Sequence, residues 1–187
     1  WLYYALQFMS GARRQIFVVF AGFLMVEKFE FTVAEISMLL IANAAINVVF
    51  APKIGRLIQR FGERKSLIFE YIGLSLIFAG YAFVESSHFA VFLYIADHLF
   101  FSIAIALKTY FQKIADPADI ASSSGVSFTI NHIAAVFIPV AFGLVWLSSP
   151  SLVFLAGSGM AIVSLILALN MPSKPAFGNE VLLGKFS

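Results

Sequence analysis

Hydrophobic residues along the chain fall into six long runs separated by short polar connections. A helix that crosses a bilayer needs about 20 mostly apolar residues, and each run is close to that length or longer. The predicted spans are residues 1–26, 33–51, 66–84, 89–107, 120–146 and 150–171. The pattern predicts an all-α membrane protein, with a six-helix bundle over residues 1–172 and a cytoplasmic C-terminal tail over 173–187.

The overall composition agrees with a membrane location. The chain is 61% hydrophobic and 12% charged, which is far from the usual composition of a soluble domain. It has no cysteine, which excludes disulfides and thiolate metal sites. The net charge of +2 indicates no nucleic-acid partner, because in a membrane protein the position of the basic residues matters more than their sum.

Three sequence positions carry signals for the start of a helix. Thr32 and Glu35 form the pattern of a capping box, in which each side chain accepts from the other residue's backbone amide. Asp116-Pro117 and Ser149-Pro150 each read as an N-cap followed by a proline in the first helical turn.

The basic residues predict the orientation, because Lys and Arg near helix ends are retained on the cytoplasmic side. Only Lys28 lies at the opposite ends of the spans. We therefore expect both ends of the chain to be cytoplasmic, in the inner (plasma) membrane of a prokaryote. The nine residues on the cytoplasmic side are Lys53, Arg56, Arg60, Arg64, Lys65, Lys108, Lys113, Lys174 and Lys185.

Arg13 and Arg14 interrupt the first apolar run near its middle. Residues 16–26 alone would cover only about half the hydrocarbon thickness, so the helix must include both arginines. An unpaired charge at that depth costs at least about 2.5 kcal/mol. In one reading a guanidinium lines a cavity, where it binds an anionic group or biases the protonation of a carboxylate such as Asp97. In the other it is held in an ion pair with Asp97 and hydrogen bonds to Gln15 or Asn43. Adjacent helical positions point about 100° apart, which favours one arginine in each role.

Other polar residues concentrate on four of the six spans. The first, second, fourth and fifth are therefore expected to face a cavity, and the third and sixth to face lipid. Glu70 lies near the cytoplasmic start of the third span, where we expect it to pair with Arg60, Arg64 or Lys65. The candidate residues of a substrate and proton pathway are Arg13, Arg14, Gln15, Asn43, Asn47, Asp97, His98, Asn131 and His132.

The polar pattern repeats after three helices. Arg13 aligns with Asp97 (97 − 13 = 84) and Arg14 with His98, and Asn43 and Asn131 are 88 positions apart. Three is an odd number, so the second copy enters the membrane from the other face. Such a 3+3 inverted repeat is typical of secondary transporters, whose binding sites lie near the midplane.

The stretch GRLIQRFGERK, residues 55–65, resembles the signature loop of the major facilitator superfamily, G-x-x-x-D-R-x-G-x-R-K. The matching residues are Gly55, Arg60, Gly62, Arg64 and Lys65. Gln59 stands where the family usually has aspartate. The acid that normally forms the family's gating ion pair is therefore absent at this position. The resemblance implies that the chain corresponds to helices seven to twelve of a twelve-helix transporter, and the apolar start at Trp1 fits a missing N-terminal six-helix half.

The resemblance implies a secondary active transporter of a small solute, working by alternating access and coupled to protons, and not an enzyme. Asp97 and His98 are the candidates for proton coupling, although His98 could equally be a neutral imidazole bonded to the backbone or to Asn131. The alternative is a non-transporting membrane assembly, or a pigment- or haem-binding protein of the same architecture, with His98 or His132 as ligand. The intramembrane histidines lack further ligands in the sequence, so we expect no metal and no cofactor.

Overall fold

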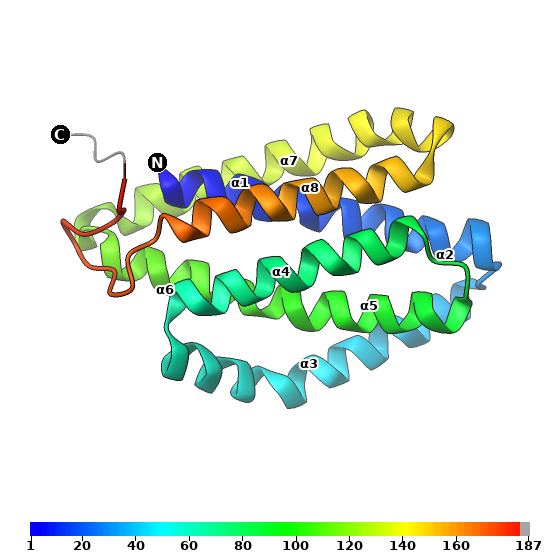
Figure 1. Cartoon of the computed structure of the whole chain (residues 1–187), viewed down its shortest axis with the longest axis horizontal. Coiled ribbons are helices and arrows are strands. Elements are labelled where there is room, and N and C mark those ends of the chain that lie inside the picture. Colours follow the sequence, from blue (N-terminus) through cyan, green and yellow to red (C-terminus); the bar gives the residue numbers. More distant parts are fainter. Residues whose placement is uncertain (184–187) are drawn as a thin grey trace.

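The computed structural model describes residues 1–183 and confirms the six predicted membrane helices (Figure 1). Two of them are composites. The first span joins α1 (Leu2–Gln15), the π-helix η1 (Ile16–Ala21) and α2 (Gly22–Phe29). The fourth joins α5 (Ser87–Phe101), the 3-10 helix η2 (Ser102–Ala104) and α6 (Ile105–Ile114). The others are α3 (Val33–Phe61), α4 (Glu63–Ala82), α7 (Ile120–Ser148, preceded by the 3-10 turn η3, Pro117–Asp119) and α8 (Pro150–Leu169).

Two of the three capping predictions are confirmed. The Thr32 hydroxyl accepts from the Glu35 amide at 3.3 Å, and the Glu35 carboxylate accepts from the Thr32 amide at 2.8 Å. The Asp116 carboxylate accepts from the Ala118 amide at 2.9 Å, at the start of η3. The third is half wrong, because Pro150 begins α8 but the Ser149 side chain makes no capping hydrogen bond.

The helices continue further into the polar connections than the hydrophobic runs predicted. α3 extends to Phe61, so most of the signature stretch is helical and only Gly62 interrupts the chain before α4. Gly62 has φ +81°, a backbone conformation that glycine adopts without strain. α6 likewise continues to Ile114. Lys, Arg and Gln are good helix formers, so a helix does not stop where hydrophobicity stops.

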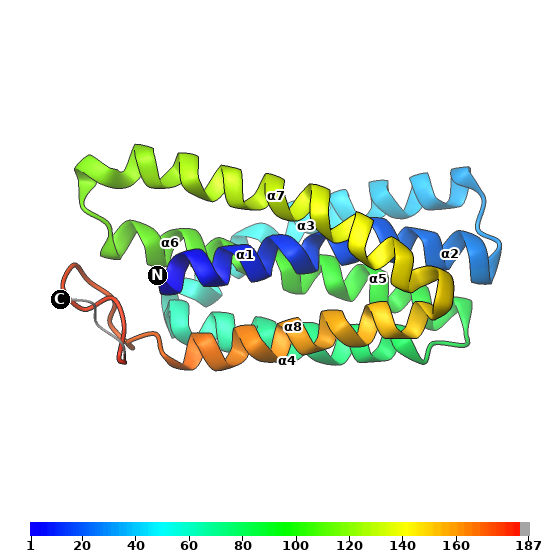
Figure 2. The same cartoon turned by 90° about the horizontal axis from the view of Figure 1, so that it is seen from above.

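The first span occupies the middle of the bundle. α1 packs against α7 on one side and α8 on another, and α4 runs along α8 (Figures 1 and 2). α3 and α7 form the outer parts of the bundle and leave most of their apolar side chains exposed. The prediction that the third and sixth spans merely face lipid is wrong, since α4 and α8 bury Glu70 and Ser164 in the interior.

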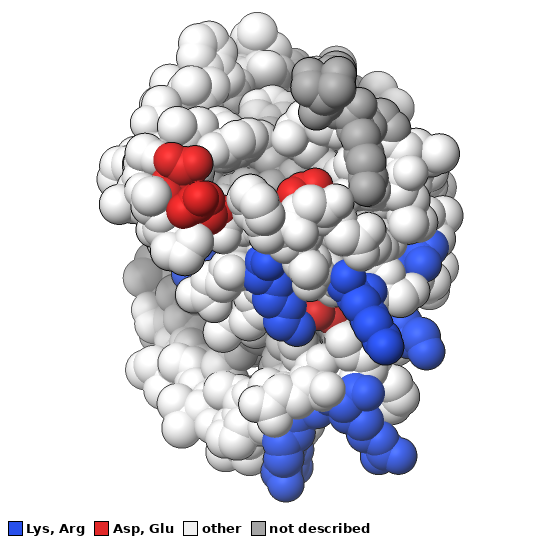
Figure 3. Space-filling model, turned by 90° about the vertical axis from the view of Figure 1, so that its left-hand side faces the viewer, with Lys and Arg blue, Asp and Glu red and all other residues white. Residues whose placement is uncertain are grey.

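One end of the bundle gathers the start of the chain, the end of α8 and most of the basic residues. The junctions between α3 and α4 and between α6 and α7 lie there, and Figure 3 shows Lys and Arg side chains across this end face. The chain after α8 folds back on it: Tyr110 donates to the carbonyl of Glu180 at 2.5 Å, and the Leu183 amide donates to the Asn170 side chain at 2.7 Å. Lys185, counted with the cytoplasmic residues above, lies outside the described residues.

Gly73 allows α4 to approach α5, and its replacement tests this packing. A Cβ at Gly73 would overlap the ring of Phe100, whereas a Cβ at Gly159 would meet nothing within 4 Å. Gly73→Ala should lower the free energy of unfolding by about 1–3 kcal/mol, the usual cost of overpacking. Gly159→Ala should be neutral or stabilising by up to about 1 kcal/mol, because alanine is the better helix former. Thermal unfolding in detergent measures both, and equal melting temperatures would contradict the packing.

Candidate functional site

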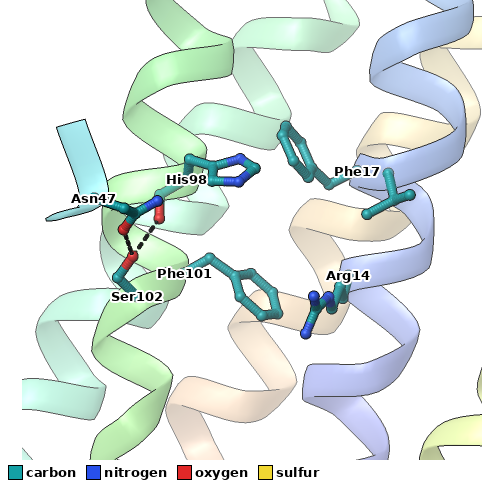
Figure 4. Close-up of a pocket in the computed structure, with 7 residues that line it drawn as sticks. Arg14, Phe17, Asn47, His98, Phe101 and Ser102 are labelled. Carbon is teal, nitrogen blue, oxygen red and sulfur yellow. Dashed lines mark hydrogen bonds between the residues drawn. The ribbon is translucent and has the colours of Figure 1, made fainter. Parts of the chain in front are cut away.

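A pocket of about 220 Å³ lies where α1 and η1 meet α3 and the end of α5. Arg14 and Phe17 enter it from the first span, and His98 and Phe101 face them from α5 (Figure 4). Its remaining lining residues are Val18, Asn47 and Ser102. One charged group, three aromatic rings and two small polar groups thus surround a single cavity.

The Arg14 guanidinium is the charged group of this pocket. It lies 5.8 Å from the centre of the Phe101 ring, and the side chain is exposed. In the described part of the chain it has neither a hydrogen bond nor an ion pair. Its donors are therefore available to a molecule that enters the pocket.

His98 lies opposite, with its ring edge-on to Phe17 at 5.3 Å. Its Nδ1 is buried and has no hydrogen-bond partner among the described residues. The predicted hydrogen bond from His98 to Asn131 is not formed. Asn131 lies against Gly11 of α1, where a Cβ added to the glycine would be 2.6 Å from its Oδ1.

The polar edge of the pocket joins α3 to α5. The Ser102 hydroxyl lies between two acceptors, Asn47 Oδ1 and the carbonyl oxygen of His98, the latter at 2.8 Å. Asn43 is one turn earlier on α3 and fully buried, and both polar atoms of its side chain lack a partner in the described structure. Of the predicted asparagines, Asn47 is therefore the one that lines the pocket.

Arg13 points away from this pocket, into the interior between α1, α4 and α8. It is completely buried, and its Nη1 donates to the Ser164 hydroxyl and to the Met160 carbonyl, the latter at 3.4 Å. The guanidinium also lies 4.7 Å from the centre of the Tyr71 ring. Its Nε and Nη2 have no hydrogen-bond partner among the described residues.

Two carboxyl groups share this interior with Arg13. Glu70 and Asp97 are both fully buried, and Arg13 is a charged neighbour of each. None of their four oxygens has a hydrogen-bond partner in the described chain. The ion pair expected between Arg13 and Asp97 is thus not a direct contact.

The predicted pairing of Glu70 with the basic signature residues is wrong. Arg64 donates to the Leu169 carbonyl at 2.9 Å instead, and the ion pair at this end joins Glu63 to Lys113 at 2.5 Å. Glu70 lies two helical turns inside α4, where it turns toward Arg13 and Asp97. α8 packs along α4 and covers it, so Glu70 lies in the interior of the bundle although it is close to the start of its helix.

The remaining predicted residues lie outside the pocket. Gln15 is half-buried on α1 and does not line it. His132 is exposed on α7, where its Nδ1 lies 2.9 Å from the Phe128 carbonyl and its ring packs on Phe128 at 3.9 Å. It is therefore engaged with its own helix.

The comparison with protein families settles the relationship. The family model described as Major Facilitator Superfamily matches residues 3–182. The chain belongs to this superfamily. No curated protein and no solved structure matches it.

The facilitator signature residues occupy the basic end of the bundle. Gly55 and Gly62 line a hollow beside the Glu63–Lys113 ion pair, together with Gln59. Arg60 lies 5.5 Å from the Phe61 ring, and Lys65 lines a separate shallow pocket with Phe69. With Arg64 bonded to the end of α8, the signature links α4 to the chain that leaves the sixth span.

The structure gives the aligned residues of the two facilitator repeats equivalent surroundings. Arg13 and Asp97 are both fully buried, while Arg14 and His98 both line the pocket. The irregular segments correspond as well, since residues 102–104 of η2, shifted by 84 positions, fall within the π-helix over 16–21.

Several residues of the Arg14 pocket and of the buried surroundings of Arg13 carry no sequence signal that marks them as functional. Phe17, Phe101 and Tyr71 are aromatic residues within apolar runs, where nothing distinguishes a pocket wall from lipid-facing surface. Ser102 and Ser164 are single hydroxyls in apolar helices. Glu70 did carry a signal, because a carboxylate inside a span marks a functional position by default.

The two arginines should differ sharply in their effect on stability. Arg13→Met leaves Glu70 and Asp97 buried without their cation, so the free energy of unfolding should fall by about 3–5 kcal/mol, as when one partner of a buried charged set is removed. Arg14→Met removes an exposed side chain without hydrogen bonds and should change it by about 0.5 kcal/mol or less. Thermal unfolding of the purified variants measures the difference, and similar losses would contradict the burial of Arg13.

Proposed function

We propose that this chain is the C-terminal half of a twelve-helix secondary active transporter, which moves a small solute by alternating access and is coupled to protons. The pocket around Arg14 is the observation that carries the proposal. It combines a guanidinium that has no hydrogen bond or ion pair among the described residues with aromatic and hydrogen-bonding groups from two repeats of the fold. Membership of the superfamily supports transport as its use.

The exposed faces of the bundle support a second half. α3 and α7 leave large apolar side chains uncovered, including Val48 and Leu144, which are 75% and 70% exposed. Lipid would cover the exposed side chains on one side of each helix. An N-terminal six-helix half, packed across the pocket, would cover those on the other side. The solute would then bind between the halves, with Arg14 contributed by this one.

The pocket chemistry favours an organic anion. An arginine fork binds a carboxylate or phosphate with two parallel hydrogen bonds. Phe17 and Phe101 offer faces on which a planar apolar group packs, and Asn47 and Ser102 supply hydrogen bonds at the far edge. An aromatic carboxylate matches all three features.

Benzoate is a suitable probe of this site, with benzamide as a neutral compound of the same shape. Benzoate should raise the melting temperature of the full protein more than benzamide does, and Arg14→Gln should weaken this binding about 10- to 100-fold, because a charge-assisted hydrogen bond contributes about 1.5–3 kcal/mol. Arg56→Gln is the matched control, since Arg56 is exposed on α3 outside the pocket. An equal response to both compounds, or an unchanged affinity in Arg14→Gln, would argue against the anion site.

Transport itself is tested in proteoliposomes containing the full protein. An imposed proton gradient should drive accumulation of an organic anion, a protonophore should abolish it, and Arg14→Gln should reduce it at least tenfold while Arg56→Gln does not. Flux that ignores the collapsed gradient would refute proton coupling and leave transport standing. No flux of any solute from a broad panel would refute transport.

A further inference from the structure

A second pocket, of about 370 Å³, lies at the end of the bundle opposite the basic end. α2 ends there, beside the last turn of α4 and the turn from α7 to α8, at the right of Figure 1. Its volume is typical of small-molecule sites, about 300–1,000 Å³, and it shares no lining residue with the Arg14 pocket. Two charged side chains and three aromatic rings dominate its lining: Glu27, Lys28, Tyr81, Trp146 and Phe154.

The two charges lie on different sides of this pocket. Glu27 and Lys28 are consecutive on α2, and both side chains are exposed. Trp146 Nε1 donates to Glu27 Oε2 at 2.8 Å, which holds the carboxylate on the α7 side. Lys28 Nζ donates to the Val84 carbonyl at 2.7 Å, which holds the ammonium at the connection after α4. The pocket therefore has one negative and one positive side, each fixed by a contact with another helix or its connection.

Both charged groups can still bind a ligand. The Oε1 atom of Glu27 makes no hydrogen bond within the described part of the chain. The Lys28 ammonium carries three donors and uses one of them on Val84. No ion pair joins Glu27 to Lys28 among residues 1–183, so the two charges do not neutralise each other by direct contact.

The aromatic walls of the pocket are preformed. Trp146 stacks on Phe20 with ring centres 5.3 Å apart and lies edge-on to Phe154 at 5.9 Å. Phe154 in turn stacks on Tyr81 at 5.0 Å. All four rings are buried, so each is held by its neighbours. An indole ring attracts an ammonium group, and Trp146 lies directly beside the Glu27 carboxylate.

We propose that this pocket binds a zwitterion with an apolar body. Glu27 and Trp146 bind its ammonium group, Lys28 binds its anionic group, and Phe154 and Tyr81 pack against the body. A ligand with only one charge would leave one side of the pocket without a counter-charge. Two sources share this chemistry: a free molecule such as an aromatic amino acid, and the head of phosphatidylethanolamine at the membrane surface. The site does not rest on the proposed transport function.

A purely structural role for Glu27 and Lys28 makes a different prediction. Their bonds to Trp146 and Val84 also fasten the end of the first span to its neighbours. Loss of such a fastening would lower the stability of the protein and affect every ligand alike. A binding role predicts instead that each substitution weakens only the ligand group that faces the substituted residue.

Calorimetry of the full protein in detergent tests the site with three related compounds. L-phenylalanine carries both charges, phenethylamine lacks the carboxylate, and 3-phenylpropionate lacks the ammonium. In the Arg14→Gln background, which removes the contribution of the solute pocket, phenylalanine should bind at least about tenfold more tightly than either, because each lost charge removes a charge-assisted hydrogen bond. Phenylalanine should also change the tryptophan emission, and Trp146→Phe should remove that change.

Single substitutions assign each charge to its partner. Glu27→Gln should weaken phenylalanine binding at least about tenfold and leave 3-phenylpropionate binding unchanged. Lys28→Met should weaken phenylalanine to a similar extent and leave phenethylamine unchanged. Glu30→Gln is the matched control, because Glu30 is exposed just after α2 and does not line the pocket. Equal loss for all three compounds in Glu27→Gln and Lys28→Met would indicate a structural role and refute the site.

Bilayers of defined composition separate the two sources of the zwitterion in the unsubstituted protein. Phenylalanine that binds in phosphatidylglycerol bilayers but not in phosphatidylethanolamine bilayers would assign the site to the lipid head. Equal binding in both would assign it to a free zwitterion. Absence of phenylalanine binding in both, with the same tryptophan emission in the two lipids, would refute the proposal. That result would leave the transport function untouched, because Arg14 lies in a different pocket.

Discussion

The structure depends on a guanidinium enclosed in a membrane bundle. Arg13 cannot lose its charge and cannot remain unpaired among hydrocarbon side chains. Its neighbours are the ones such a charge requires: a hydroxyl from Ser164, the Met160 carbonyl, the face of Tyr71, and two carboxyls. α4 and α8 are thereby bound to the first span by polar contacts as well as by packing, which explains why two helices that read as lipid-facing carry buried polar groups.

The geometry of one helix separates two environments. Successive residues point about 100° apart, so a helix that buries Arg13 turns Arg14 to a different side, where it meets Phe101 and the pocket. The same separation holds on α5, between Asp97 and His98. A dry ionisable interior and an open pocket thus lie on opposite sides of two helices without any loop between them. Substitutions in the pocket can therefore change its lining while the buried polar contacts of Arg13 remain in place.

The sequence predicted what depends on hydrophobic length and local chemistry. The six spans, the capping box at Thr32 and the inclusion of both arginines in the first span all follow from residues close together in the chain. What it missed depends on which helices pack side by side. The sequence predicts that Glu70 pairs with nearby basic residues, because it gives the distance of Glu70 from the start of the span and does not show that α8 covers this part of α4. The same limit applied to Phe17 and Phe101, which are indistinguishable from lipid-facing residues until α1 and α5 are placed together.

The inverted repeat explains why opposite charges occupy equivalent positions. An internal pseudo-symmetry places residue 13 and residue 97 in similar buried surroundings, and the sequence fills them with an arginine and an aspartate. Two arginines there would repel, and two aspartates would leave the interior negative. The addition of Glu70 from α4, which has no counterpart charge in the pair, breaks that balance by one unit. Symmetry therefore accounts for the Arg13–Asp97 combination, and Glu70 is an additional buried carboxyl that lies outside it.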